Sequence, residues 1–235
     1  MLGKTVVSLD CQNSSIQRVI CADGETFDAD FVISSMPLKE LIMGIRGTPK
    51  RIQSIAESLE YRNFVTVGLR VPKTLISNSG LPLGDQWLYI QDHTVALGRI
   101  QILDNWSDAL NPVPGTVCLG LEYFCSTDDP TWLQSDDDWI QQANKDISTL
   151  RLFSDEWTEQ DNTVIRCEKA YPCYWGGFHH VNELLHFTGG IRNLFCVGRN
   201  GCHSYSNMDQ VMLSAMKAVE CIIAKDSHDW SRDER

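Results

Sequence analysis

Residues 191–210 read IRNLFCVGRNGCHSYSNMDQ, and this stretch decides the fold. Residues 194–197 form a short apolar run, which is typical of a buried strand in a parallel sheet. Gly198 and Gly201 follow at once, and glycine lets a backbone turn sharply or approach a ligand closely. Asn207 is a residue type that favours the N-cap of a helix. The stretch therefore predicts a strand, a glycine-rich loop and the start of a helix.

The helix that begins after Asn207 is predicted to carry one apolar stripe, because apolar residues recur along it at helical spacing. These residues are Met208, Val211, Met212, Ala215, Met216, Val219, Ile222 and Ile223. The N-terminus of such a helix presents unpaired N–H groups and the positive end of its dipole. It can hold a phosphate, or the electron-rich edge of a ring that gains charge on reduction. A strand–glycine–helix unit is also common without any ligand, so the turn alone does not distinguish a ligand-binding role from a purely structural one.

The composition is that of an acidic globular chain. It has 235 residues, of which 43% are hydrophobic, enough for a sizeable core in one or two domains. The formal net charge is −11, so no nucleic-acid partner is expected, although a local basic site for an anionic ligand stays open. No run of 18 apolar residues occurs, and no membrane span is expected.

The nine cysteines are scattered and form no Cys-x-x-Cys pair. With no secretory signal recognised, we expect reduced thiols and a cytoplasmic location. Cys196 and Cys221 lie among apolar residues and are expected to be small core residues. The histidines His179, His180 and His186 have no carboxylate or thiol at a metal-ligand spacing, so no metal site is predicted.

The remaining elements follow from local patterns. Residues 5–9, 16–21 and 26–28 read as a β-meander with a hairpin signal at Asp23-Gly24. Residues 29–37 read as a buried strand, and helices are expected within residues 38–59. Further strands are predicted at residues 63–71, 87–91, 97–103, 117–124 and 163–170. A helix over residues 136–152 would be capped by Ser135 or Asp136, and polar connections favour a mostly antiparallel sheet.

The loop and helix start resemble the C-terminal flavin-binding segment of the superfamily of FAD-dependent amine oxidases, protoporphyrinogen oxidases and UDP-galactopyranose mutases. The residues that carry the resemblance are Gly198, Arg199, Gly201, Tyr205, Asn207, Met208 and Asp209. In that family the Gly-Arg pair lies beside the FAD, and the following helix points its N-terminus at the flavin pyrimidine. The resemblance implies FAD as the cofactor, with Gly198, Arg199, Asn207, Met208 and Asp209 as cofactor-binding residues.

The resemblance also implies the fold class, which is α/β (α+β overall). A partial, doubly wound FAD-binding domain would carry an inserted substrate domain made of a mostly antiparallel sheet and a helix. The expected parts are an FAD-domain piece at 1–44, the substrate domain at 45–185, the C-terminal strand–loop–helix at 186–225 and a disordered tail at 226–235. Superfamily members begin with a Gly-x-Gly-x-x-Gly turn for the FAD pyrophosphate. The first 60 residues contain no match, so a homodimer or an N-terminal partner chain is expected to supply the missing half of the FAD site.

Arg99 lies inside an apolar strand, where an unpaired charge would be costly. Its partner can be a carboxylate or a ligand anion, and the residues themselves leave both open. Residues 97–100 resemble the mutase strand that carries a diphosphate-binding arginine, and the same comparison puts Tyr171 and Tyr205 on substrate-side tyrosines. Together with Arg199, these groups would suit an anionic small molecule.

Other residues near the expected site have less specific roles. His203 lies in the glycine-rich loop, where it is expected to face solvent rather than to hydrogen-bond flavin or substrate. Tyr174 and Trp175 can wall a substrate pocket or pack in the core. No catalytic acid or base is identified, because in flavoenzymes the cofactor supplies the redox chemistry.

Three hypotheses about function follow from the resemblance. The first is an FAD-dependent oxidoreductase whose flavin accepts a hydride from an unidentified small substrate. The second is a sugar-nucleotide isomerase like UDP-galactopyranose mutase, which uses reduced flavin. The third is an inactive or binding-only fragment, because the pyrophosphate half of the FAD site is missing from the sequence.

Overall fold

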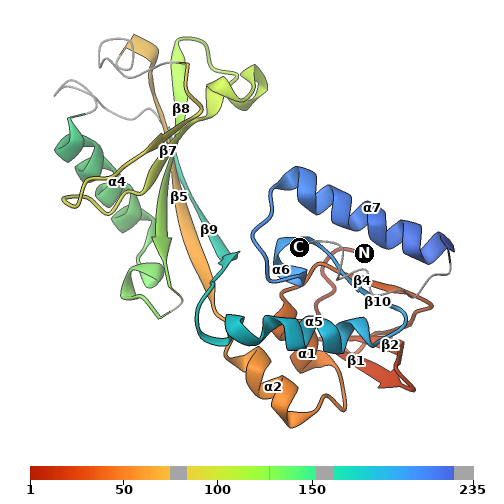
Figure 1. Ribbon diagram of the computed structural model, residues 1–235. Coiled ribbons are helices and arrows are strands. Elements are labelled where there is room, and N and C mark those ends of the chain that lie inside the picture. Colours follow the sequence, from red (N-terminus) through yellow and green to blue (C-terminus); the bar gives the residue numbers. More distant parts are fainter. Residues whose placement is uncertain (75–83, 127, 152–160, 225–235) are drawn as a thin grey trace. The chain divides into compact units, whose positions relative to one another are not determined.

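The computed structural model divides into two compact units (Figure 1). Unit 1 comprises Met1–Tyr61 and Tyr171–Arg235, and unit 2 comprises Arg62–Ala170. The structure describes residues 1–74, 84–126, 128–151 and 161–224. The tail predicted at residues 226–235 lies outside the described residues.

Unit 1 begins with the predicted meander, an antiparallel sheet of three strands. They are β1 (Val6–Gln12), β2 (Ser15–Cys21) and β3 (Thr26–Asp28). Gly24 lies in the turn between β2 and β3 with φ of +85°, a left-handed conformation that glycine adopts without steric cost. The Asp23-Gly24 signal therefore predicted the hairpin correctly.

A parallel pair of strands links the two ends of unit 1. Strand β4 (Val32–Ser34) lies beside β10 (Leu194–Cys196) in parallel register. The predicted parallel strand at 194–197 is confirmed, while the strand predicted at 29–37 is shorter than expected. The glycine-rich loop follows the carboxyl end of β10, and the first helix of the unit follows the carboxyl end of β4.

Helices cover both faces of this pair. They are α1 (Leu38–Gly44), α2 (Lys50–Glu57), α5 (Val181–Gly189), the single turn α6 (Gly198–Gly201) and α7 (Met208–Ala224). Helices α1, α2 and α5 share one apolar core with the meander, whereas α7 packs on the opposite face against Phe195 and Val197. Helix α5 was not predicted from the sequence, although Val181, Leu184 and Thr188 recur at helical spacing and are buried.

The unit boundaries differ from the domain boundaries predicted at 44/45 and 185/186. The chain changes units at 61/62 and at 170/171. The reason is packing: α2 contacts α1 and α5, and α5 contacts β10, so both helices belong with the parallel strands.

Unit 2 is a five-stranded sheet with a helix on one face. The strand order is β6-β7-β8-β5-β9, and the pairs β6/β7, β7/β8 and β5/β8 are antiparallel. The strands are β5 (Tyr61–Pro72), β6 (Trp87–Tyr89), β7 (Arg99–Ile102), β8 (Thr116–Cys125) and β9 (Asp161–Pro172). The predicted sheet-plus-helix module is confirmed.

Helix α4 (Asp136–Leu150) packs on this sheet through Trp139, Ala143 and Ile147. Ser135 caps it, because the Asp138 N–H donates to Ser135 Oγ at 3.2 Å and the Ser135 N–H donates to the Asp138 carboxylate at 3.2 Å. This reciprocal capping box confirms the predicted helix start. Short 3-10 turns occupy Leu103–Asn105, Asp108–Leu110, Pro130–Leu133 and, in unit 1, Gly176–His180.

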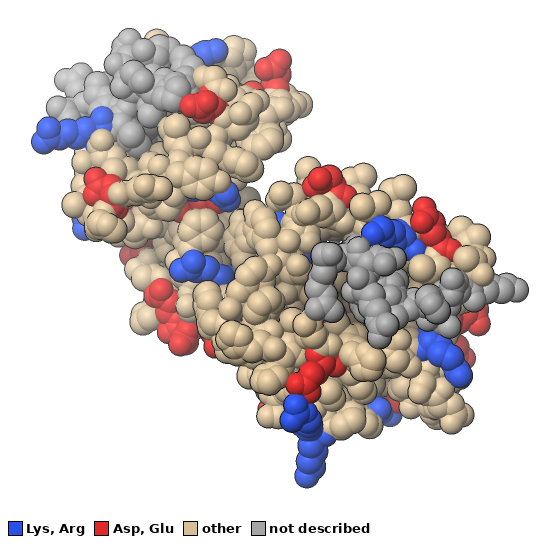
Figure 2. Space-filling view, viewed as in Figure 1, with Lys and Arg blue, Asp and Glu red and all other residues tan. Residues whose placement is uncertain are grey.

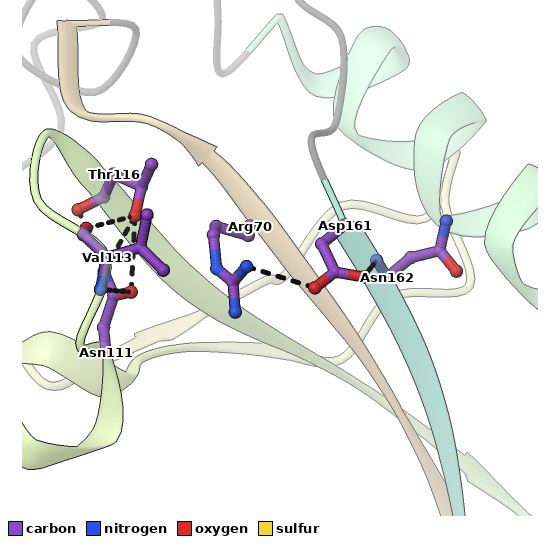
Figure 3. A network of polar contacts seen from close by, with 6 residues as sticks. All are labelled: Arg70, Asn111, Val113, Thr116, Asp161 and Asn162. Carbon is purple, nitrogen blue, oxygen red and sulfur yellow. Dashed lines mark hydrogen bonds and ion pairs between the residues drawn. The ribbon is translucent and has the colours of Figure 1, made fainter.

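Polar contacts fasten the strand ends of unit 2. Arg70 of β5 pairs with Asp161 at the start of β9, with 3.1 Å between Nη1 and Oδ2 (Figure 3). On a separate loop in the same view, the Asn111 side chain donates to the carbonyl oxygen of Thr116. The Thr116 hydroxyl in turn donates to the carbonyl oxygen of Val113. The contacts of Asn111 and Thr116 hold the entry to β8, and the Arg70–Asp161 pair joins β5 to β9.

On the face shown in Figure 2, the Lys and Arg residues of the described chain are dispersed among acidic residues and form no continuous basic patch. All nine cysteines are free thiols. Among the described helices, none is long and apolar enough to cross a membrane.

Candidate functional site

The glycine-rich loop leaves the carboxyl end of β10 and bends sharply. Gly198 has φ of +73°, and its N–H donates to Ser214 Oγ of α7 at 3.0 Å. A Cβ at Gly201 would lie 2.7 Å from the backbone oxygen of Ser34, the last residue of β4. Glycine is therefore required at both positions, and the loop lies tightly between β4 and α7.

The start of α7 agrees with the sequence prediction. Its first intrahelical bond runs from the Val211 N–H to the Asn207 carbonyl, at 2.9 Å, and the Asn207 N–H donates to Gln210 Oε1 at 2.9 Å. The N–H groups of Met208, Asp209 and Gln210 precede that first bond, so they have no partner within the helix. Met208 is 83% exposed, and the helix start faces away from the core.

Arg199 is held by the loop that it belongs to. Its Nε and Nη2 donate to the Ser206 carbonyl at 3.0 and 2.8 Å. Its guanidinium carbon lies 4.9 Å from the ring centroid of Tyr171 and 4.8 Å from that of Tyr205, within cation–π range. Arg199 thus ties the loop to both predicted substrate-side tyrosines.

The two tyrosines are brought together by the fold. Tyr171 and Tyr205 stack with 6.1 Å between ring centroids and 13° between planes. The Tyr205 N–H donates to the Tyr174 hydroxyl at 2.5 Å, and the Tyr174 ring stacks on Phe178 at 4.4 Å. Tyr174 and Tyr205 stay about half exposed, so these aromatic groups border the surface rather than the core.

His203 contradicts its expectation, because it is only 1% exposed. Its backbone has φ of +47°, and this turn directs the ring inward. Nε2 lies 3.2 Å from the Cys173 carbonyl oxygen, and the ring meets Tyr61 edge to face at 4.8 Å. Burial lowers the pKa of His203, so the neutral imidazole is favoured. His203 is a structural link between the loop and the segment after β9, not a solvent-facing residue.

A cavity of about 280 Å³ opens between the loop and one side of α7. It is lined by Gly198, Cys202, Ser204, Tyr205, Ser206, Gln210, Leu213, Ser214 and Lys217. Among these residues, only Gly198 and Tyr205 were predicted site residues. Gln210, Leu213, Ser214 and Lys217 recur at helical spacing on one side of α7, and this spacing is the signal that could have identified them.

Arg99 belongs to unit 2 and has a carboxylate partner. Its guanidinium pairs with Glu122 on the neighbouring strand β8, with 2.7 Å between Nε and Oε2, and Gln101 donates to the same carboxylate. Glu122 is 1% exposed, and the Trp87 ring lies 5.0 Å from the guanidinium carbon. The ion pair that the sequence left open is thus present, while a ligand contact of Arg99 stays a prediction.

Comparison with known proteins identifies the family. The model of the flavin containing amine oxidoreductase family matches residues 1–223, and the chain belongs to this family. The family is a flavin-containing one, and FAD is its usual cofactor. No curated protein matches the chain.

Solved structures agree with this fold. One, of reduced UDP-galactopyranose mutase, has a TM-score of 0.81 and 21% identity, with 99% of this chain and 49% of that chain covered. A second, provisionally assigned as a protoporphyrinogen oxidase from Exiguobacterium sp. 255-15, has a TM-score of 0.70 and 13% identity, with 94% and 47% covered. A third, an oxidoreductase from Methanosarcina mazei, has a TM-score of 0.58 and 13% identity, with 93% and 49% covered. The chain therefore spans about half the length of the structures it matches.

The described residues fit one side of an FAD site. A glycine turn at the carboxyl ends of parallel strands, followed by a helix N-terminus, is the setting in which α/β folds hold dinucleotides. Gly198 and Gly201 are buried and let the loop pack tightly between β4 and α7, and no acidic side chain lines the adjoining cavity. The contacts of Gly198, Arg199, Asn207, Met208 and Asp209 with FAD stay predictions.

Proposed function

We propose that this chain forms part of an FAD-dependent oxidoreductase of the amine oxidase family and acts on a small, anionic substrate. When bound, the flavin would supply hydride acceptance. The observation that supports the proposal most is the unit 1 site, where the glycine-rich turn and the start of α7 adjoin a cluster of Arg199, Tyr171 and Tyr205.

The residues of the chain would have distinct tasks. The amides of Met208 and Asp209 would hydrogen-bond the edge of the flavin that gains charge, because they have no partner within the helix and lie at the positive end of α7. The half-exposed Tyr205 would contact the substrate, and Arg199 would hold its ring in place through the Ser206 carbonyl. Arg99 would offer a guanidinium for an anionic group, with its orientation set by Glu122.

The test is an absorbance spectrum of the purified chain before and after addition of FAD, followed by gel filtration. We expect flavin bands near about 375 and 450 nm to co-elute with the protein, since these bands belong to the oxidised cofactor itself. The Gly201→Ala variant should lose them because its Cβ would press on the backbone of Ser34, whereas Gly84→Ala, which has open space, should keep them. A wild-type protein that stays colourless after addition of FAD would favour the inactive-fragment hypothesis.

A second candidate is sugar-nucleotide isomerisation with reduced flavin. It is supported by the mutase neighbour, whose fold covers 99% of this chain at a TM-score of 0.81. If UDP-galactose raises the melting temperature of the flavin-loaded protein and UDP or galactose alone does not, the isomerase is favoured over the oxidoreductase.

A further inference from the structure

Gly68 and Arg70 lie on the face of the unit 2 sheet that is opposite α4. Their neighbour Leu69 belongs to the core under α4, and side chains alternate between the two faces along a strand. In the register of β5 and β8, Arg70 lies opposite Cys118. A glycine inside a strand often marks a place where another group approaches the backbone closely. At Gly68 that group is Thr163 of β9, whose Cγ2 would lie 2.8 Å from an added Cβ.

A cavity of about 140 Å³ lies between β5, β8 and β9, and we call it the Arg70 cavity. Its lining includes Gly68, Arg70, Leu103, Cys118, Asp161 and Thr163. Apolar atoms form most of its wall. Because a cavity of about 150 Å³ holds a molecule as large as benzene, the Arg70 cavity accommodates about six non-hydrogen atoms.

Arg70 directs one hydrogen-bonding edge to a partner and keeps a second edge for another group. Its Nη1 donates to Asp161 Oδ2 at 3.1 Å (Figure 3). Its Nε is buried and has no hydrogen-bond partner within the described residues. A buried N–H without an acceptor is destabilising, so this atom indicates a site for an acceptor. Nε and Nη2 form a fork whose geometry matches the two oxygens of a carboxylate.

The carboxylates near the cavity already have donors of their own. Asp161 accepts from Arg70 Nη1 and from the N–H of Asn162. Asp104 accepts from the N–H of Cys118 and from the side chain of Asn111, each at 2.8 Å. Neither of them uses Arg70 Nε, so the fork of Nε and Nη2 is the group of this cavity that recognises an anion.

We propose that the Arg70 cavity binds a short-chain carboxylate of up to about six non-hydrogen atoms. The carboxylate of the ligand would accept from Nε and Nη2 of Arg70, and its alkyl part would pack against Gly68 and Leu103. The inference goes beyond the proposed function, because the cavity lies within unit 2 and none of its lining residues belongs to the proposed flavin or substrate contacts.

The test uses the thiol of Cys118 as a reporter, because it lines the cavity and is only partly buried. The chain without flavin is treated with iodoacetamide at constant ionic strength, with and without propionate, and the labelling rate of each cysteine is followed by peptide mass spectrometry. Propionate at about nine times its Kd should slow the labelling of Cys118 about tenfold. Cys167, also partly buried but outside the lining, should react at an unchanged rate. Propionamide, which has the same shape without the charge, should protect Cys118 far less.

Two matched variants test the role of the guanidinium fork. Arg70→Lys keeps the charge but removes the fork, so it should weaken the protection by propionate at least about tenfold. Arg166→Lys should leave the protection unchanged. Arg166 pairs with Asp136, and the side chains of that pair are 30% and 61% exposed, against 28% and 60% for Arg70 and Asp161. The ratio of rates with and without propionate is compared within each variant, and matching thermal melts exclude misfolding.

Three results would overturn the proposal. One is a labelling rate of Cys118 that propionate does not change, and another is equal protection by propionate and propionamide. The third is protection in a folded Arg70→Lys variant that equals protection in the wild type. The first two need only the wild-type chain, so they decide the question even if Arg70→Lys does not fold. Because no flavin is present, none of these results depends on whether the chain binds FAD.

Discussion

At the scale of single residues, the arginines show how a fold assigns partners that a sequence leaves open. Arg99 and Glu122 are 23 positions apart, yet the antiparallel register of β7 and β8 puts them side by side. A buried guanidinium without this carboxylate would be strongly destabilising. Arg199 instead donates to the Ser206 carbonyl and contacts the rings of Tyr171 and Tyr205.

His203 leads to a prediction about pH. Burial lowers its pKa in the folded protein below the value of about 6.5 in the unfolded chain, so the unfolded chain binds the proton more readily. Above a pH of about 6.5, the neutral His203 makes its full stabilising contribution to the free energy of unfolding. It falls as the pH drops below that value, by roughly 1 kcal/mol per pH unit until the folded pKa is reached. Urea unfolding at pH 7.5 and 5.5 measures this loss.

The matched variants separate His203 from the other histidines. His203→Asn removes the titration and keeps a residue that tolerates the left-handed backbone, so it should flatten the pH dependence. The exposed His179→Asn should leave it as in the wild type. Equal pH dependence in His203→Asn and the wild type would refute the assignment.

At the scale of elements, the glycine-rich loop is set by how closely it approaches β4. Replacing Gly201 with alanine would bring Cβ within 2.7 Å of the Ser34 carbonyl oxygen, which cannot move without disturbing the parallel pair. We expect a loss of about 1–3 kcal/mol in the free energy of unfolding, typical of overpacking. Chemical denaturation measures it.

The control for this substitution is Gly84→Ala, where a Cβ meets no atom within 4 Å. Its free energy of unfolding should change by less than about 0.5 kcal/mol. If both variants unfold at the same denaturant concentration, the close packing of α6 on β4 does not contribute to stability.

At the scale of the whole molecule, stability rests on packing rather than on cross-links. All nine cysteines are free, and four of them are buried, namely Cys21, Cys125, Cys173 and Cys196. Burial raises the pKa of the Cys196 thiol to about 12, so it has little thiolate at neutral pH.

Thiol titration tests this picture. In denaturant, a chromogenic disulfide reagent should react with nine thiols without prior reduction, whereas in the native protein the four buried thiols should react slowly. A reducing agent should leave the melting temperature unchanged. Fewer than nine reactive thiols in denaturant, restored by reduction, would show a disulfide and contradict the structure.

The sequence by itself determined most elements, because their signals are local. The apolar run before Gly198, the turn at Asp23-Gly24 and the cap at Ser135 each depend on a few neighbouring residues, and each was predicted correctly. The helix start after Asn207 and the antiparallel module in the middle of the chain were also readable. The motif around Gly198 and Arg199 was enough to indicate the flavin-containing family.

Only the tertiary structure decided the long-range relations. It paired β4 with β10, joined α2 and α5 to the same core, and stacked Tyr171 on Tyr205. It also buried His203 and turned the apolar stripe of α7 outward. Periodicity shows that a helix has an apolar face, but which neighbour that face meets depends on contacts between segments far apart in the chain. For this reason the sequence predicted the parts of the site, and only the fold showed which of those parts lie together.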